Sequence, residues 1–330
     1  MDSGNIGFVL LCAAFVFVMT PGLAMFYGGL VRKKNVVNTM MTSIFIIGVG
    51  IVMWVLFGYS LSFAPSENAF IGDFRWLGLE GVSLTEGYTD DASIPNMVFS
   101  AFQMMFAVIT PALITGAVAG RMKFKSIFVF TIFWSLIVYY PLAHMVWGQG
   151  GLLGADGIGA LDFAGGDVVH ISSGVSALVL CILLGKRHDY EHSIYRIHNI
   201  PTVVLGASLL MFGWFGFNAG SALAADGLAA HAFMTTGVSA AAAMLSWMLC
   251  DVIKNKKPTL IGASTGMVAG LVGITPGAGF VPMWAAVIIG LTTSPVCYIM
   301  ISYGKKKFGF DDALDAFSCH GTGGIWGGLL

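Results

Sequence analysis

The chain has 330 residues, of which 57% are apolar and only 10% are charged, and its formal net charge is −1. A soluble globular domain usually carries about a quarter charged residues, so this chain has too few to cover a surface that faces water. Its mean hydropathy of +0.84 agrees with that exclusion. Segments of roughly 20 apolar residues recur, each long enough to cross a bilayer as a helix. The composition therefore predicts an all-α polytopic membrane protein.

Ten apolar segments follow one another along the chain. We expect membrane spans at about 6–31, 37–62, 95–119, 126–147, 166–185, 200–222, 230–252, 259–279, 282–303 and 312–330. The N-terminal stretch "MDSGNIG" has no basic region before the first apolar run, so we expect no cleavable signal peptide.

The basic residues fix the expected orientation. Of the 16 lysines and arginines, 15 lie in the connections after the first, third, fifth, seventh and ninth spans. The positive-inside rule then places those connections in the cytoplasm and the N-terminus outside, in a protein of the cytoplasmic membrane. The long outer loop, about 63–94, is acidic apart from Arg75. This composition is typical of a solvated loop. The alternative interpretation is that the loop weakly attracts cations.

No pattern typical of a metal centre or an enzyme active site is present. The five cysteines lie in or beside apolar segments without metal-ligand or disulfide spacing: Cys12, Cys181, Cys250, Cys297 and Cys319. No serine stands in a nucleophile-elbow pattern. We expect no metal, no cofactor, no enzymatic activity and no nucleic-acid partner.

Two histidines lie inside apolar segments at matching positions. Asp162 precedes His170 by eight residues, and Asp312 precedes His320 by eight. At about 1.5 Å per residue, we expect each interval to span roughly 12 Å of helix. Because the fifth and tenth spans run in opposite directions, both histidines should meet near mid-membrane. This predicts one membrane domain over 1–330, built from inverted repeats of five helices at about 6–190 and 198–330, a common plan of transporters.

The histidines also allow other interpretations. A lone histidine in a membrane helix can be a hydrogen-bonded packing residue. Zinc binding is a weak alternative, because Cys319 and His320 are adjacent and their side chains diverge by about 100° on a helix.

Aromatic residues cluster near the ends of several spans. Phe102 and Phe106 are one helical turn apart in "AFQMMF", and Trp214 and Phe217 stand together in "GWFGFNAGS". Any of these can be packing residues or part of an interfacial aromatic belt.

Several motifs resemble those of the ammonium transporter (Amt/Mep/Rh) family. They are "FYGGLVRKKN", "AHMVWGQGG", "DFAGGDVVHISSG", "GWFGFNAGS" and "GLVGITPGAG", and the similarity runs in order along the whole chain. The resemblance implies a homotrimer with one narrow, apolar pore per subunit. It also implies transport of ammonium across the cytoplasmic membrane, with bacterial-type Amt proteins as the nearest group.

The resemblance assigns roles at the outer mouth of this pore. Trp147, Ser221 and Phe106 would bind ammonium there, and Asp162 would order the site without touching the substrate. A cation over the indole and phenyl faces gains an attraction of about 1–2 kcal/mol.

Deeper in the pore, the resemblance implies a gate of two stacked rings, Phe106 and Phe217, with Phe102 and Trp214 beside it. Below the gate, a pair of imidazoles would stabilise neutral ammonia: His170 and His320. A whole ion would face a large desolvation cost in that section, and ammonium can avoid it by releasing a proton.

Two features depart from the family's pattern. The family implies an eleventh helix and a tail beyond Leu330, or a fused signalling domain if the protein is an ammonium sensor. For a transporter, the resemblance also implies regulation by a PII-type protein that inserts a loop at the cytoplasmic mouth. Asp167 stands where the family usually has a small neutral residue. It lies three residues before His170. One interpretation is that another helix caps Asp167 or that it faces water outside the pore. The other is that it stabilises a protonated imidazole or traps the cation, because a nearby opposite charge favours the protonated form.

Overall fold

The computed structural model describes residues 1–155, 157–187, 190 and 197–330. These residues form helices joined by turns and loops, without a strand among the described residues. In chain order, the helices are α1 (Ser3–Leu30), η1 (Lys33–Asn35), α2 (Val36–Met53), η2 (Trp54–Gly58), α3 (Tyr59–Phe63), η3 (Leu77–Leu79), α4 (Asn96–Ile114), α5 (Phe124–Trp134), η4 (Ser135–Tyr139), α6 (Tyr140–Trp147), η5 (Gly166–Ile171), α7 (Ser172–Leu184), α8 (Ile200–Gly220), α9 (Gly227–Asn255), α10 (Leu260–Ile274), α11 (Met283–Ile299), η6 (Met300–Gly304), α12 (Lys305–Phe308), η7 (Phe317–Gly321) and α13 (Thr322–Leu329).

Helices of this length and composition make the chain a multi-pass membrane protein. Within the described residues, eight helical stretches are long and apolar enough to cross a bilayer. Large apolar side chains such as Val37, Ile137 and Leu183 are exposed on their outward faces. Such faces suit lipid, because water would penalise so much exposed apolar surface.

Every expected span has a helical counterpart. The third is shorter than predicted, because α4 ends at Ile114 and not near residue 119, and two others are also shorter. The counterpart of the eighth expected span, α10, ends at Ile274 and not near residue 279, and that of the tenth begins at Phe317 and not at 312. In the case of α10, the chain turns at Thr275–Phe280, which contains Pro276 and two glycines. In the case of the tenth span, the residues before the helix form its cap, as described below.

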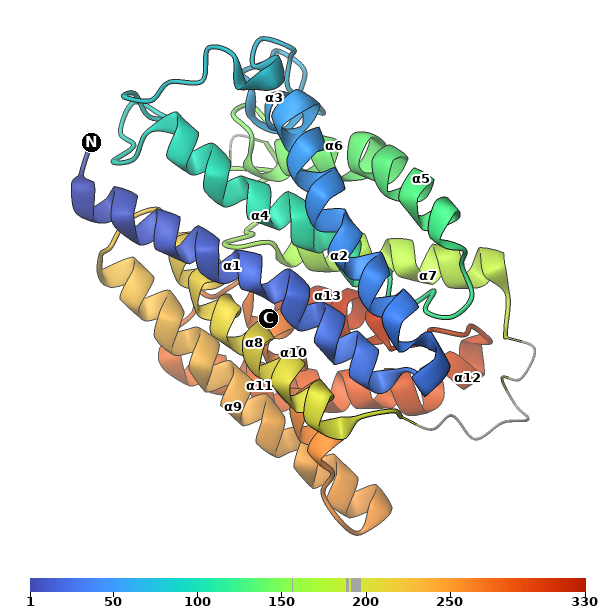
Figure 1. Cartoon of the computed structure of the whole chain (residues 1–330). Helices are drawn as coiled ribbons and strands as arrows, with labels where there is room; N and C mark the ends of the chain where they lie inside the picture. The colour runs from blue at the N-terminus through green and yellow to red at the C-terminus, as the bar shows by residue number, and fades with distance from the viewer. Residues whose placement is uncertain (156, 188–189, 191–196) are drawn as a thin grey trace.

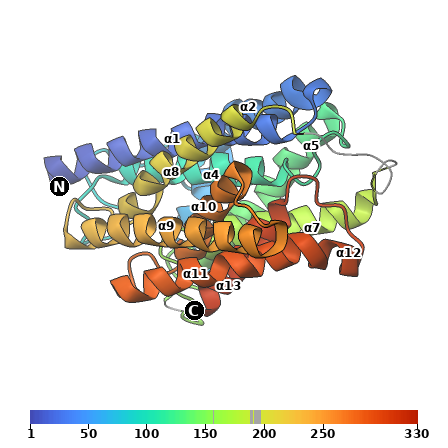
Figure 2. The same cartoon turned by 90° about the horizontal axis from the view of Figure 1, so that it is seen from below.

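The helices of the two halves form two groups that pack along each other (Figures 1 and 2). The main seam between the groups joins α1 to α8, which run side by side. Small residues allow this approach: a side chain at Gly206 would come within 2.3 Å of the Phe26 backbone nitrogen. In lipid, such close backbone packing replaces the hydrophobic effect as the force that holds helices together.

A buried ion-pair network closes the end of the bundle that carries the basic loops. The carboxylate of Asp311 is fully buried and accepts hydrogen bonds from the Arg187 guanidinium at 2.7 Å on each oxygen. Arg121 lies 3.6 Å from the same carboxylate. The network joins the segments that follow α4 and α7 to the segment that precedes η7.

Candidate functional site

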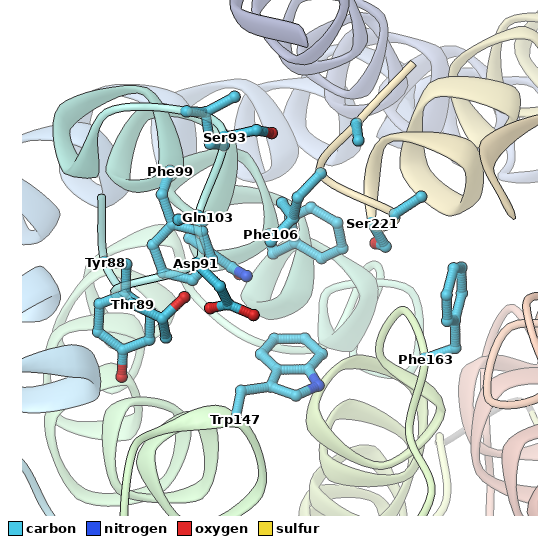
Figure 3. Close-up of a pocket in the computed structure, with 15 residues that line it drawn as sticks. Tyr88, Thr89, Asp91, Ser93, Phe99, Gln103, Phe106, Trp147, Phe163 and Ser221 are labelled. Atoms are coloured by element: carbon cyan, nitrogen blue, oxygen red, sulfur yellow. The ribbon is translucent and has the colours of Figure 1, made fainter. Parts of the chain in front are cut away.

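A cavity of about 440 Å³ opens beneath the loop at residues 63–94, and Trp147, Phe106 and Ser221 line it (Figure 3). The Phe106 and Trp147 rings meet edge to face, with centroids 6.0 Å apart. The Ser221 hydroxyl donates to the Phe217 carbonyl at 2.9 Å, so its lone pairs stay free to accept. We call this the first cavity. It brings together the three side chains that the sequence predicted at the outer mouth.

Asp162 holds in place the Trp147 ring that lines the first cavity. Its carbonyl accepts a hydrogen bond from the Trp147 indole nitrogen at 3.0 Å, which fixes the orientation of that ring. Asp162 does not line the first cavity.

The Asp162 carboxylate caps the start of η5. One oxygen accepts the amides of Gly165 and Gly166, both at 2.6 Å, and the other accepts those of Asp167 and Val168, at 2.8 and 3.1 Å. The expectation of 12 Å of continuous helix from Asp162 to the histidine is therefore wrong. Helix begins at Gly166, because the carboxylate satisfies the first free amides of the helix in place of a preceding turn.

Asp312 begins η7 in a similar way, and the same correction applies to its interval. Its carboxylate accepts the backbone amides of Ala316, at 2.9 Å, and Ser318, at 3.1 Å. Both η5 and η7 are π-helical turns that carry the histidine and then continue as α-helix. Such turns are rare and are often found at functional sites.

Two phenylalanine rings lie in contact at the edge of the first cavity, which Phe106 lines and Phe217 does not. Phe106 and Phe217 are both buried, and their centroids lie 4.3 Å apart. Phe102 packs edge to face on Phe106 at 4.9 Å. Trp214 lies 5.5 Å from Phe217, and its indole nitrogen donates to the Thr275 hydroxyl at 2.9 Å. The four aromatic residues predicted for the gate therefore form one chain of ring contacts, in the order Phe102, Phe106, Phe217 and Trp214.

His170 and His320 come together below these rings. Their imidazoles stack with centroids 5.3 Å apart at an angle of 21°. His170 also stacks on Phe217, with ring centroids 6.1 Å apart, and on Trp214, with centroids 5.2 Å apart. Two residues 150 positions apart in the sequence thus form one pair inside the protein.

The imidazole nitrogens of this pair lack the partners that a packing histidine would have. Both ring nitrogens of His170 and Nδ1 of His320 are buried without a hydrogen bond to any described residue. His144 is also buried, but its two nitrogens lie 3.1 and 3.0 Å from the carbonyls of Ser62 and Asn68. Because an unpaired buried polar group is costly, the pair is suited to bind a solute that supplies the missing hydrogen bonds.

A second cavity, of about 210 Å³, lies beyond the pair, and His320, Tyr27 and Asp315 are among its lining residues. Phe106 lines the first cavity, and His320 lines the second. Between the two cavities, the ring contacts run through four side chains, which we call the ring row: Phe106, Phe217, His170 and His320.

The helices that carry the two histidines touch through glycine. A methyl group at Gly174 would come within 2.2 Å of the Gly321 nitrogen and 3.1 Å of the His320 carbonyl carbon. The distance between the imidazoles therefore depends on the absence of a side chain at this crossing.

We expect Gly174→Ala to lower the free energy of unfolding by about 2 kcal/mol, because overpacking forces the backbones apart. The midpoint of thermal unfolding in detergent measures it. Gly48→Ala is the matched control: Gly48 is exposed on α2 with no atom within 4 Å of an added methyl. Similar midpoints for the two variants would contradict this account of the crossing.

Comparison with known proteins agrees with this geometry. The model of the Ammonium Transporter Family matches residues 7–330. The chain belongs to the ammonium transporter family. It is 53% identical to an ammonium transporter of Bacillus subtilis (strain 168) over 329 residues, which cover all of this chain and 80% of that relative. The crystal structure of Saccharomyces cerevisiae Mep2 superimposes with a TM-score of 0.91 at 38% identity and covers 100% of this chain and 75% of Mep2.

A solved structure described as a sensor Amt protein is also similar. It has a TM-score of 0.89 and 29% identity, and the match covers 99% of this chain and 81% of that one.

Asp167 remains the least defined member of the predicted site. It lies one turn before His170, it is partly buried, and it lines neither of the two cavities. Its backbone amide donates to Asp162, and its carboxylate has no hydrogen bond or ion pair with a described residue.

Gln103 lines the first cavity of this ammonium transporter family member but was not among the predicted site residues. The sequence could have indicated Gln103 as a site residue, because it is a lone amide among apolar residues in "AFQMMF". A polar side chain in a membrane helix is expensive and often functional.

Proposed function

We propose that this protein conducts ammonium, as neutral ammonia, across the cytoplasmic membrane. The observation that carries the proposal is the ring row, in which two imidazoles with unpaired nitrogens stand between two cavities. Membership in the ammonium transporter family supports the same function.

At the first cavity, the cation binds over Trp147 and Phe106 and donates one N–H to the Ser221 hydroxyl. The edge-to-face arrangement of the two rings offers it both π faces, and the attraction is about 1–2 kcal/mol when the ion is partly desolvated. Asp162 acts on this site indirectly, since it fixes the indole through its carbonyl.

The contact between Phe106 and Phe217 separates the first cavity from the imidazoles, so the solute passes when these rings part. In the ring row no carboxylate is available to stabilise a whole ion, which would lose its hydration without replacement. Ammonium avoids this cost by giving its proton to water on the outer side and continuing as neutral ammonia. Potassium and sodium cannot, and selectivity follows from that difference. Ammonia then crosses while it hydrogen-bonds to His170 and His320.

The proposed function also includes an orientation in the membrane, a pair of inverted repeats and a trimeric assembly. The first cavity faces outward, because 15 of the 16 lysines and arginines lie in the loops of the opposite side. The carboxylate-capped π-helical turns η5 and η7 support a division into inverted repeats at about 6–190 and 198–330. Three copies assemble, each with its own path.

An ammonium sensor is the second candidate, favoured by the similarity to the sensor Amt protein. It would use the same first cavity but pass little substrate. Ammonium binding without flux would identify it.

Uptake into liposomes tests the proposal. The purified protein should carry radiolabelled methylammonium at a rate that ammonium inhibits and that an equal concentration of potassium does not. Liposomes without protein are the control for leakage. Binding of ammonium with no uptake above this control would overturn the transport proposal in favour of the sensor.

A further inference from the structure

Gln103 presents an unpaired amide to the first cavity. Its side chain is only 9% exposed, and its carbonyl oxygen is buried without a hydrogen bond to any described residue. It precedes Phe106 by three residues on α4, so the two side chains share one helix face. No described residue holds the amide in one orientation, so a half-turn about its last side-chain bond presents either the oxygen or the nitrogen to the cavity.

Asp91 brings a negative charge to the same space. It is exposed, it lines the first cavity, and its carboxylate has no hydrogen bond or ion pair with a described residue. Figure 3 shows the Asp91 carboxylate and the end of the Gln103 side chain pointing into the cavity together with the Trp147 ring. Arg75, the one basic residue of the loop at 63–94, is paired with Asp73 at 2.6 Å. Its charge is therefore already engaged.

We propose that Gln103 and Asp91 form a capture site for a small cation with N–H donors, ahead of the cation–π site at Trp147 and Phe106. The Gln103 carbonyl accepts one N–H, and the Asp91 carboxylate attracts the cation from bulk water. Hydrogen bonds between a neutral acceptor and a charged donor are stronger than those between neutral groups. The Gln103 oxygen gains on binding the partner that it lacks in the free protein.

The two residues contribute in different ways. Asp91 is exposed, so its attraction is long-ranged and is screened by salt, with a Debye length of about 10 Å at 0.1 M and about 3 Å at 1 M. Gln103 is buried and acts by contact, so its contribution persists in salt. This inference rests on the proposed function and deepens it, because it adds residues to the recognition of the same substrate.

The test measures the KM of methylammonium uptake and, separately, equilibrium binding of radiolabelled methylammonium to the purified protein. Gln103→Met keeps the size of the side chain and removes the acceptor, and Gln103→Glu keeps an acceptor. We expect the Met variant to raise KM and Kd by about tenfold at low and high salt, with the maximal rate little changed. The Glu variant should bind at least as tightly as the unaltered protein.

Asp91→Asn should raise KM and Kd by about threefold at low ionic strength and have no effect at 1 M salt. Asp90→Asn is the matched control, because it removes the same charge from the neighbouring exposed residue, which does not line the cavity. It should leave both constants unchanged.

Unchanged methylammonium binding in Gln103→Met, or equal effects of Asp90→Asn and Asp91→Asn, would overturn the capture site. Failure of the unaltered protein to transport would instead overturn the proposed function, and the binding measurements would still decide this inference.

Discussion

Replacing Asp162 with alanine is expected to destabilise the protein by at least about 3 kcal/mol and to abolish transport. The buried carboxylate accepts four backbone amides at the start of η5. Each hydrogen bond to a charged acceptor is worth about 1.5–3 kcal/mol, and the amides left without a partner are buried with it. The same change would loosen the loop whose carbonyl holds the Trp147 indole, so the first cavity would lose its shape.

Asp226→Ala is the matched control for this prediction. Asp226 is an exposed cap of α9, where its side chain accepts one amide, that of Ala229, at 2.9 Å. Loss of a single exposed cap costs about 1 kcal/mol. Thermal unfolding in detergent and methylammonium uptake should be measured for both variants. Equal stability and uptake in the two would mean that the Asp162 carboxylate is an ordinary helix cap.

The start of the tenth span marks the limit of what the sequence could predict. The spans themselves were predictable, because a long apolar segment and its flanking charges are local properties of the chain. The helix start at Phe317 was not, since it depends on the side chain of Asp312 folding back onto the later amides of Ala316 and Ser318. A hydropathy pattern does not predict such a hydrogen bond between a side chain and the backbone.

The candidate site was only partly predictable for a related reason. The equal spacing of the two Asp–His pairs indicated that His170 and His320 belong together, and the structure stacks them. The unpaired state of their nitrogens depends on neighbours from distant segments, and the sequence does not contain it. The loop at 63–94 was expected to be solvated, but it contributes Tyr88 and Asp91 to the first cavity. A loop's docking position depends on packing that no local pattern describes.

Replacing His170 with leucine is expected to slow ammonium transport by about 30-fold while potassium remains excluded. Leucine keeps the ring row apolar, so the barrier to a whole ion stays high. Neutral ammonia loses the hydrogen bond that offsets its dehydration, which costs about 2 kcal/mol and corresponds to about 30-fold in rate. His320→Leu should act in the same direction, because its imidazole stacks on that of His170.

Rate and selectivity together separate the possible roles of the imidazoles. His231→Leu is the control, because His231 makes an ordinary hydrogen bond to the Val281 carbonyl at 2.8 Å, away from the ring row. Methylammonium uptake and potassium flux should be measured in liposomes for all three variants.

If His170→Leu transports as fast as His231→Leu, the imidazoles are packing residues. If it slows transport but admits potassium, the imidazoles exclude ions. Slow transport with potassium still excluded is what the proposed mechanism requires, because selectivity then comes from the dry path, and the imidazoles act only on the ammonia within it.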